Sequence, residues 1–147
     1  MSEMKRILTV TALLVGMSGV AFGQASIVGR WKTIDDETGK PKSVVEIYEV
    51  EGKYFGKVLK LFRGEGEDPD PVCKECDPQD DRYQQRVIGM DIIRDLEQDG
   101  DEFEDGTILD PANGKVYDCK LWIEDGTLQV RGYIAFLYRT QTWKRHE

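Results

Sequence analysis

"KVYDCKLWIEDGTLQVRGYIA", residues 115–135, decides the fold, because apolar and polar side chains alternate on both sides of a single turn. In the first half, the apolar face carries Tyr117, Cys119, Leu121 and Ile123. In the second half, the equivalent face carries Leu128, Val130, Gly132 and Ile134. Asp125-Gly126 stands between the halves, and this dipeptide favours a tight turn. A period of two on each side of such a turn predicts an antiparallel β-hairpin with one buried face.

The same pattern extends over most of the chain. Further runs with strand character cover residues 29–35, 43–50, 53–62, 90–96, 106–110 and 139–145. Turn dipeptides that end in glycine stand between or beside several of them: Glu51-Gly52, Asp99-Gly100, Asp105-Gly106 and Asn113-Gly114. We therefore predict an all-β fold, a small antiparallel up-and-down meander of roughly eight strands. Closure into a barrel would remove the exposed edges of such a sheet.

The first 23 residues have the features of a secretory signal peptide. Lys5 and Arg6 precede an apolar run from Ile7 to Phe22, and small residues follow it. We predict cleavage after Gly23, with a cut after Ala25 as the alternative. The mature protein would then be a single domain of residues 24–147 without a membrane span, located in the periplasm or secreted.

The net charge of the chain is −8. An acidic domain that lacks a basic stripe repels nucleic acid and anionic membrane surfaces, so neither is an expected partner. Residues 63–86 hold many of the charges and are rich in Gly and Pro. A segment of that length is longer than a hairpin needs, and we interpret it as a functional lid or a mobile loop.

Cys73 and Cys76 lie in this loop and have the spacing of metal ligands or of a redox pair. A structural zinc site usually needs a second pair of ligands, and only Cys119 and His146 remain. Acidic and proline neighbours disfavour a reactive thiolate. In an oxidising compartment, a small Cys73–Cys76 disulfide is favoured, with Cys119 as a buried free thiol. A disulfide from Cys119 to one of the loop cysteines is the alternative.

No catalytic constellation is present in the sequence. The one histidine is the penultimate residue, so no Ser-His-Asp or Cys-His arrangement is predicted. The acidic segments lack the ligand spacing of an EF-hand, and no pair of carboxylates is singled out for glycoside hydrolysis. We predict no catalytic residue, no metal and no cofactor.

Two glycines raise the question of an internal pocket. Gly56 and Gly132 interrupt strands that otherwise carry bulky side chains. The favoured interpretation is a bend or bulge that lets the barrel close. The alternative is a pocket floored by Val58, Val130 and Ile134, since an eight-stranded barrel can hold one small ligand. For that pocket, the expected ligand contacts are Tyr48, Tyr54, Val58, Val130 and Tyr133.

Four blocks of the sequence, at residues 29–58, 87–93, 106–134 and 139–145, together resemble the DUF2147 family of exported bacterial proteins. The family is similar to lipocalins and other calycins, which implies a small barrel with a cavity and a binding role for small apolar ligands. Gly29 and Trp31 match the lipocalin Gly-x-Trp signature. That match implies that an arginine near the last strand packs on the tryptophan, and Arg139 and Arg145 are the candidates.

Three hypotheses for function follow, in order of preference. The first is an exported protein that binds a small apolar ligand and performs no chemistry. The second is an envelope interaction module that uses the acidic 63–86 loop to bind a protein partner not yet known. The third is a thiol-redox enzyme or an enzyme based on carboxylates.

Overall fold

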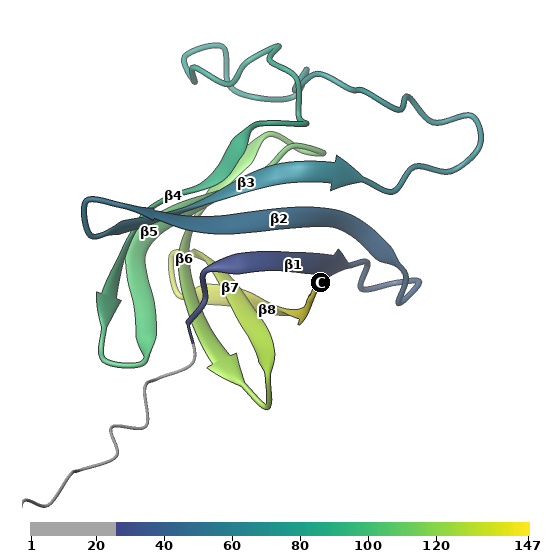
Figure 1. The fold of residues 1–147 in the computed structure, drawn as a ribbon. Coiled ribbons are helices and arrows are strands. Elements are labelled where there is room, and N and C mark those ends of the chain that lie inside the picture. Colours follow the sequence, from purple (N-terminus) through teal and green to yellow (C-terminus); the bar gives the residue numbers. More distant parts are fainter. Residues whose placement is uncertain (1–25) are drawn as a thin grey trace, which may run out of the picture.

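The computed structural model describes residues 26–147 and contains a closed antiparallel barrel of eight strands, as predicted (Figure 1). Each strand pairs with its neighbours in sequence, and the last strand pairs with the first. The strands are β1 (Gly29–Ile34), β2 (Pro41–Val50), β3 (Lys53–Leu61), β4 (Asp91–Asp99), β5 (Glu102–Asp110), β6 (Lys115–Glu124), β7 (Thr127–Ile134) and β8 (Leu137–Arg145). The predicted signal peptide at residues 1–23 lies outside the described residues.

Turn chemistry explains the hairpins. Both central residues have positive φ at Glu51-Gly52 (51° and 81°) and at Asp125-Gly126 (51° and 74°). Two consecutive positive φ values are typical of the type I′ turn, whose twist matches that of the flanking strands. Asp105 also has a positive φ, of 63°, but it lies inside β5, where the register with β6 shifts. There the Asp-Gly dipeptide forms a bulge rather than a turn.

Because neighbouring strands run in opposite directions, successive connections lie at alternate ends of the barrel. We call one end the closed end; it holds the turns at 51–52, 100–101 and 125–126. We call the other end the mouth; it holds the connections 35–40, 62–90, 111–114 and 135–136. The long segment 62–90 thus connects β3 to β4 at the mouth (Figure 1).

The core fills the barrel towards the closed end. The side chains buried there with no exposed surface include Trp31, Val45, Ile47, Ile93, Leu96, Leu121 and Leu128. They come from five different strands. Burying this much apolar surface is the main force that holds the strands together.

Trp31 anchors the closed end. Its indole Nε1–H donates a hydrogen bond of 2.8 Å to the carbonyl oxygen of Ile27. The guanidinium carbon of Arg145 lies 3.9 Å from the centroid of the indole ring, which is a cation–π contact. The same guanidinium donates hydrogen bonds of 3.1 Å to the carbonyl oxygens of Val28 and Ser26. Arg145 therefore ties the end of β8 to the segment that enters β1.

Gly29 makes this contact sterically feasible. Its φ is +127°, a conformation that other residues rarely adopt. A Cβ atom at this position would lie 2.9 Å from Nη1 of Arg145. The glycine of the Gly-x-Trp signature thus leaves space for the arginine that covers the tryptophan.

We expect Arg145→Ala to lower the free energy of unfolding by about 1–2 kcal/mol, because it removes a cation–π contact and two hydrogen bonds. Arg145→Lys should recover only part of this loss, since an ammonium cannot cover the ring and reach both carbonyls at once. Urea unfolding measures both effects. Arg30→Ala, which removes only an exposed ion pair with Glu46, is the control and should change stability little. Equal losses for the two alanine variants would contradict the anchoring role.

Candidate functional site

The two valines predicted as ligand contacts lie in the packed part of the interior. Val58 is 2% exposed and Val130 is 3% exposed. A void that could hold a water molecule would leave accessible surface on the atoms around it. The neighbouring inward-facing side chains, such as Ile47, Leu121 and Leu128, have none. This part of the barrel is filled by side chains.

The two glycines leave no open space beside them. A Cβ atom on Gly56 would lie 3.0 Å from Cβ and from Cδ1 of Ile93, so the Ile93 side chain occupies that space. A Cβ atom on Gly132 would lie 3.4 Å from Cβ of Tyr117. Ile134, the third residue of the predicted floor, is half exposed at the end of β7. Both glycines therefore admit a bulky neighbour.

The three predicted tyrosines divide between the two faces of the wall. Tyr54 points inward and packs edge-on against Phe103, with ring centroids 4.8 Å apart. Tyr48 alternates with buried Ile47 and lies on the outer face. Its hydroxyl donates a 2.7 Å hydrogen bond to Oδ1 of Asp91; burial, together with this carboxylate, raises the pKa of Tyr48 to about 12.

Tyr133 also lies on the outer face, opposite Asp118 in the neighbouring strand. It lines an open hollow of about 410 Å³ over the bulge in β5. The other side chains of this hollow are mostly charged, and Lys120 forms ion pairs there with Glu102 and Glu104, at 3.0 Å and 3.6 Å. This charged lining does not suit a buried apolar ligand. Because carboxylates and an ammonium group both line the hollow, it does not suit a ligand whose charges all have one sign either.

Inward-facing side chains remain partly exposed towards the mouth. The row that starts with buried Cys119 and its partner Gly106 continues to the pair Tyr117 and Ile108, both half-buried. On the next hairpin, the row from Val130 continues to Gln141 and Arg139, since cross-strand partners share a face. This half of the interior combines one aliphatic side chain, one phenol ring and two polar groups.

A hydrogen-bonded network connects the polar side chains of the mouth. Nη2 of Arg139 forms an ion pair with Oδ2 of Asp36, in the connection from β1 to β2. Nε2 of Gln141 donates to the same oxygen, at 3.3 Å. Nε1 of Trp143 donates a 3.3 Å hydrogen bond to Oε1 of Gln141, and Trp143 is itself buried in the core. Arg139 therefore lies at the mouth, at the opposite end of the barrel from Trp31.

Sequence reasoning did not single out Asp36, Ile108, Tyr117 or Gln141. The alternation placed Tyr117 on the apolar face, and this was the available signal. It did not show that the inward row changes from filled to partly exposed between Cys119 and Tyr117. The side chains of an inward row are buried near the closed end and partly exposed near the mouth, and the sequence does not show which end is closed.

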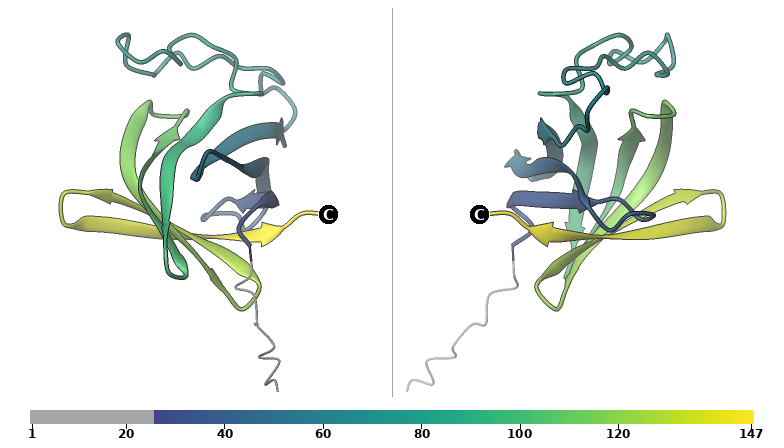
Figure 2. Two further views of the ribbon diagram at one scale, coloured as in Figure 1. Left: turned by 60° about the vertical axis from the view of Figure 1, so that its left-hand side comes forward. Right: turned by 90° about the vertical axis from the view of Figure 1, so that its right-hand side faces the viewer.

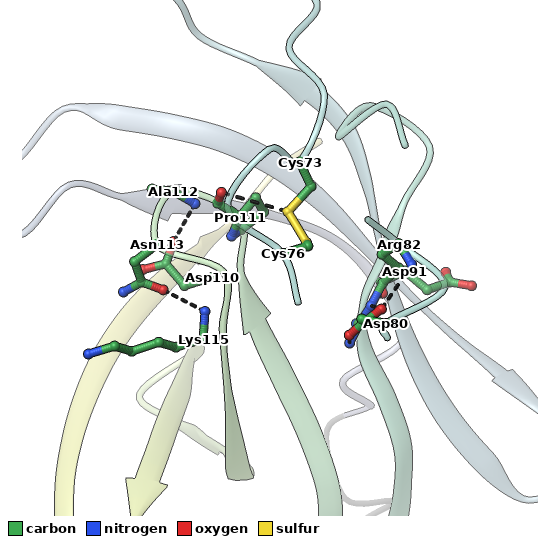
Figure 3. Close-up of a disulfide and its surroundings, with 10 residues drawn as sticks. All are labelled: Cys73, Cys76, Asp80, Arg82, Asp91, Asp110, Pro111, Ala112, Asn113 and Lys115. Carbon is green, nitrogen blue, oxygen red and sulfur yellow. Dashed lines mark hydrogen bonds and ion pairs between the residues drawn. A yellow bond between two sulfur atoms is a disulfide. The ribbon is translucent and has the colours of Figure 1, made fainter. Parts of the chain in front are cut away.

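The predicted Cys73–Cys76 disulfide is present in the long segment, and both cysteines are buried (Figure 3). It lies against the turn between β5 and β6, where Sγ of Cys73 is 3.9 Å from the carbonyl oxygen of Pro111. A Cβ atom on Gly114 of this turn would lie 1.8 Å from the carbonyl oxygen of Glu75. Only glycine permits this approach, so the disulfide loop and the turn fit each other closely.

A second set of contacts attaches residues 80–82 to the wall. The buried guanidinium of Arg82 forms a bidentate ion pair with Asp80 and donates a 3.0 Å hydrogen bond to the carbonyl oxygen of Asp91. This pairing holds the pKa of Asp80 well below its usual range. Arg94 on the outer face of β4 forms a second bidentate pair, with Asp81. Two parts of the segment are thus held against the barrel.

The third cysteine has no chemical partner. Cys119 is 3% exposed, and burial raises the pKa of its thiol to about 12. A thiol with this pKa is protonated at neutral pH and is a poor nucleophile or metal ligand. Among residues 26–147, no three His, Cys, Asp or Glu side chains are arranged to hold a metal ion. In the same range, no helix has the length and hydropathy of a membrane-spanning helix.

Thiol labelling tests this assignment of the three cysteines. In the native chain at about pH 8, we expect no labelling by Ellman's reagent, because Cys119 is buried and protonated and the other two are oxidised. After unfolding without a reductant, one thiol per chain should react. Labelling of the native chain would contradict the burial of Cys119. Three reactive thiols in the unfolded chain would contradict the disulfide.

Two solved structures match this chain. Protein HP1028 from the human pathogen Helicobacter pylori, described as belonging to the lipocalin family, matches with a TM-score of 0.70 and 20% identity over 84% of each chain. A variant of the fluorescent protein UnaG matches with a TM-score of 0.46 and 14% identity, over 82% of this chain and 96% of that one. No protein with a curated description matches.

The likeness to HP1028 shows a lipocalin-like fold. The sequence identifies the family independently of the fold, since the model of a bacterial family covers residues 29–145. That range includes every strand from the Gly-x-Trp block to the arginine that packs on the tryptophan. The chain belongs to the DUF2147 family, described as "uncharacterized protein conserved in bacteria".

Proposed function

We propose that this protein is exported and binds a small, largely apolar ligand in the mouth half of its barrel. The observation that carries the proposal is the inward-facing row of partly exposed side chains above the filled core. Ile108 and Tyr117 offer an apolar surface, and Arg139 and Gln141 offer polar groups on the facing hairpin. A ligand with an apolar body and one polar end matches this distribution.

The filled core limits the depth of the site. Val58, Val130 and the side chains below them leave no room, so the ligand would sit above them. Binding would be shallow, with the polar end of the ligand in reach of Arg139, whose side chain is 70% exposed. A polar or anionic end would compete with Asp36 for the guanidinium.

The attachment of the 62–90 segment supports this location for the site. The disulfide packs against the β5–β6 turn, and the Arg82 hydrogen bond to Asp91 and the Arg94–Asp81 ion pair hold the segment on the wall. The segment would act as a fixed rim of the mouth, since each attachment must break before it moves. The interaction module based on its acidic residues remains the second hypothesis, and the enzyme remains the third.

Native mass spectrometry of the protein purified under oxidising conditions tests the proposal first. We expect a small organic adduct that is lost on denaturation. The probe for titration is 1-anilinonaphthalene-8-sulfonate, which has an apolar body and one anionic group. Arg139→Ala should weaken binding of this probe about tenfold, the effect of losing one charged hydrogen bond. Arg30→Ala, which removes an arginine on the outer face, should leave the affinity unchanged.

The tryptophans locate the bound probe. Trp143 lies directly below Gln141, whereas Trp122 lies on the outer face beside Arg131. We expect the probe to quench tryptophan fluorescence in Trp122→Phe as in the unmodified chain, and to quench Trp143→Phe much less. Saturable binding that depends on neither Arg139 nor Trp143 would place the ligand elsewhere and refute this site. No adduct and no saturable binding would refute the function.

A further inference from the structure

The hairpin of β7 and β8 ends in an exposed apolar tip, which we define as residues 134–138. In both views of Figure 2 this hairpin reaches beyond the rest of the barrel. The exposed fractions are 50% for Ile134, 88% for Phe136, 65% for Leu137 and 61% for Tyr138. Single exposed apolar residues are common on soluble proteins, but four of them on one projecting turn form a patch.

The turn itself departs from the chemistry of the other hairpins. Glu or Asp followed by Gly forms the two-residue turns at 51–52 and 125–126, and Gly100 and Asp101 form the turn between β4 and β5. At the tip, Ala135 and Phe136 stand in the corresponding place, and Ala135 has a φ of +53°. Positive φ at a non-glycine residue is uncommon, and Glu51 in the 51–52 turn shares this feature with Ala135. What sets the tip apart is that no glycine follows Ala135, so an exposed phenylalanine stands where the 51–52 and 125–126 turns have glycine.

The side chains along the hairpin occur in a definite order. Ile134, Phe136 and Leu137 lie at or next to the turn. Tyr133 and Tyr138 follow as a cross-strand pair, with ring centroids 5.9 Å apart. Arg131 comes next, with its guanidinium carbon 4.3 Å from the centroid of the Tyr138 ring. Between Arg131 and Arg139 there are seven uncharged residues, in a chain in which 33% of residues are charged.

This order corresponds to the layers of a lipid bilayer surface. Aliphatic and phenyl groups partition into the acyl region, tyrosine rings lie at the level of the head groups, and arginines reach the phosphates. A projecting turn is narrow and convex, which suits insertion between lipid head groups. The net charge of −8 opposes an approach to anionic lipid, so the matching surface is zwitterionic.

We propose that the apolar tip docks this protein onto a zwitterionic phospholipid surface. Phe136 and Leu137 insert, the Tyr133–Tyr138 pair lies at the interface, and Arg131 faces the phosphates. The tip includes the connection 135–136, one of the four connections at the mouth end. The proposal does not depend on the ligand site, because the residues of the tip project away from the barrel (Figure 2).

The test is sedimentation with phosphatidylcholine vesicles, using the chain that starts at Gln24. This chain contains all eight strands and lacks the apolar N-terminal run, which would itself bind lipid. The test variant combines Phe136→Ser with Leu137→Ser, and the control is Val50→Ser. Val50 is 48% exposed at the closed end of the barrel, so the control also removes an exposed apolar side chain. Cooperative urea unfolding verifies that all three proteins fold.

We expect the unmodified chain and the control to partition onto the vesicles. The partition coefficient of the double variant should be lower by a factor of about ten or more. Phosphatidylglycerol in the vesicles should reduce binding at low salt, and added salt should weaken that reduction. In a second measurement, brominated phosphatidylcholine should quench the fluorescence of Phe136→Trp. The fluorescence of Val50→Trp should not change.

Two results would overturn the proposal. One is a failure of the unmodified chain to bind vesicles, and the other is equal binding by the double variant. The failure to bind has a specific explanation if a dimer forms without lipid and the double variant abolishes this dimer. In that case the apolar tip would contact a second copy of the chain.

Discussion

Closure of the barrel between its first and last strands is the constraint on which the rest of the structure depends. β1 and β8 form only two residue pairs, Trp31 with Arg145 and Lys32 with Lys144, whereas each other pair of neighbouring strands forms four to eight. The contact of Arg145 with the Trp31 ring and with two carbonyls reinforces this short seam. Because the seam lies at the closed end, the core is filled there, and the two strands are unpaired towards the mouth.

The short seam has consequences at the mouth. From Leu137 to Trp143, β8 is paired only with β7, so the hairpin is free to project from the barrel and to carry an exposed tip. The gap between β1 and β8 is crossed by side chains instead of backbone hydrogen bonds, through the ion pair of Asp36 with Arg139. Polar groups thus gather where the strands separate. The proposed ligand site and the proposed lipid contact are both at this end.

The long segment between β3 and β4 illustrates how a polar sequence becomes fixed in place. Its composition favours a mobile loop, yet its buried disulfide packs against the β5–β6 turn, where Gly114 admits its backbone. Arg82 also donates a hydrogen bond to the carbonyl oxygen of Asp91, and Arg94 of β4 forms a bidentate ion pair with Asp81. The contacts with the β5–β6 turn and with Arg94 join residues that are distant in sequence, 38 and 13 positions apart. Low hydropathy alone therefore did not predict how the segment is held.

The sequence by itself determined the antiparallel meander and the family, because alternation and turn dipeptides are local properties. It favoured the Cys73–Cys76 disulfide through close spacing, and the structure decided against a bridge to Cys119. The sequence also indicated Trp31 as a barrel-closing residue, through the Gly-x-Trp signature. Only the tertiary structure decided which arginine covers Trp31, since Arg139 and Arg145 share a face of one strand and differ only in distance from the closed end. It likewise placed Tyr48 and Tyr133 on the outer face, where a shift of one residue reverses direction. Whether Val58 borders space or packed atoms also depended on tertiary structure, because filling is the joint result of side chains from many strands.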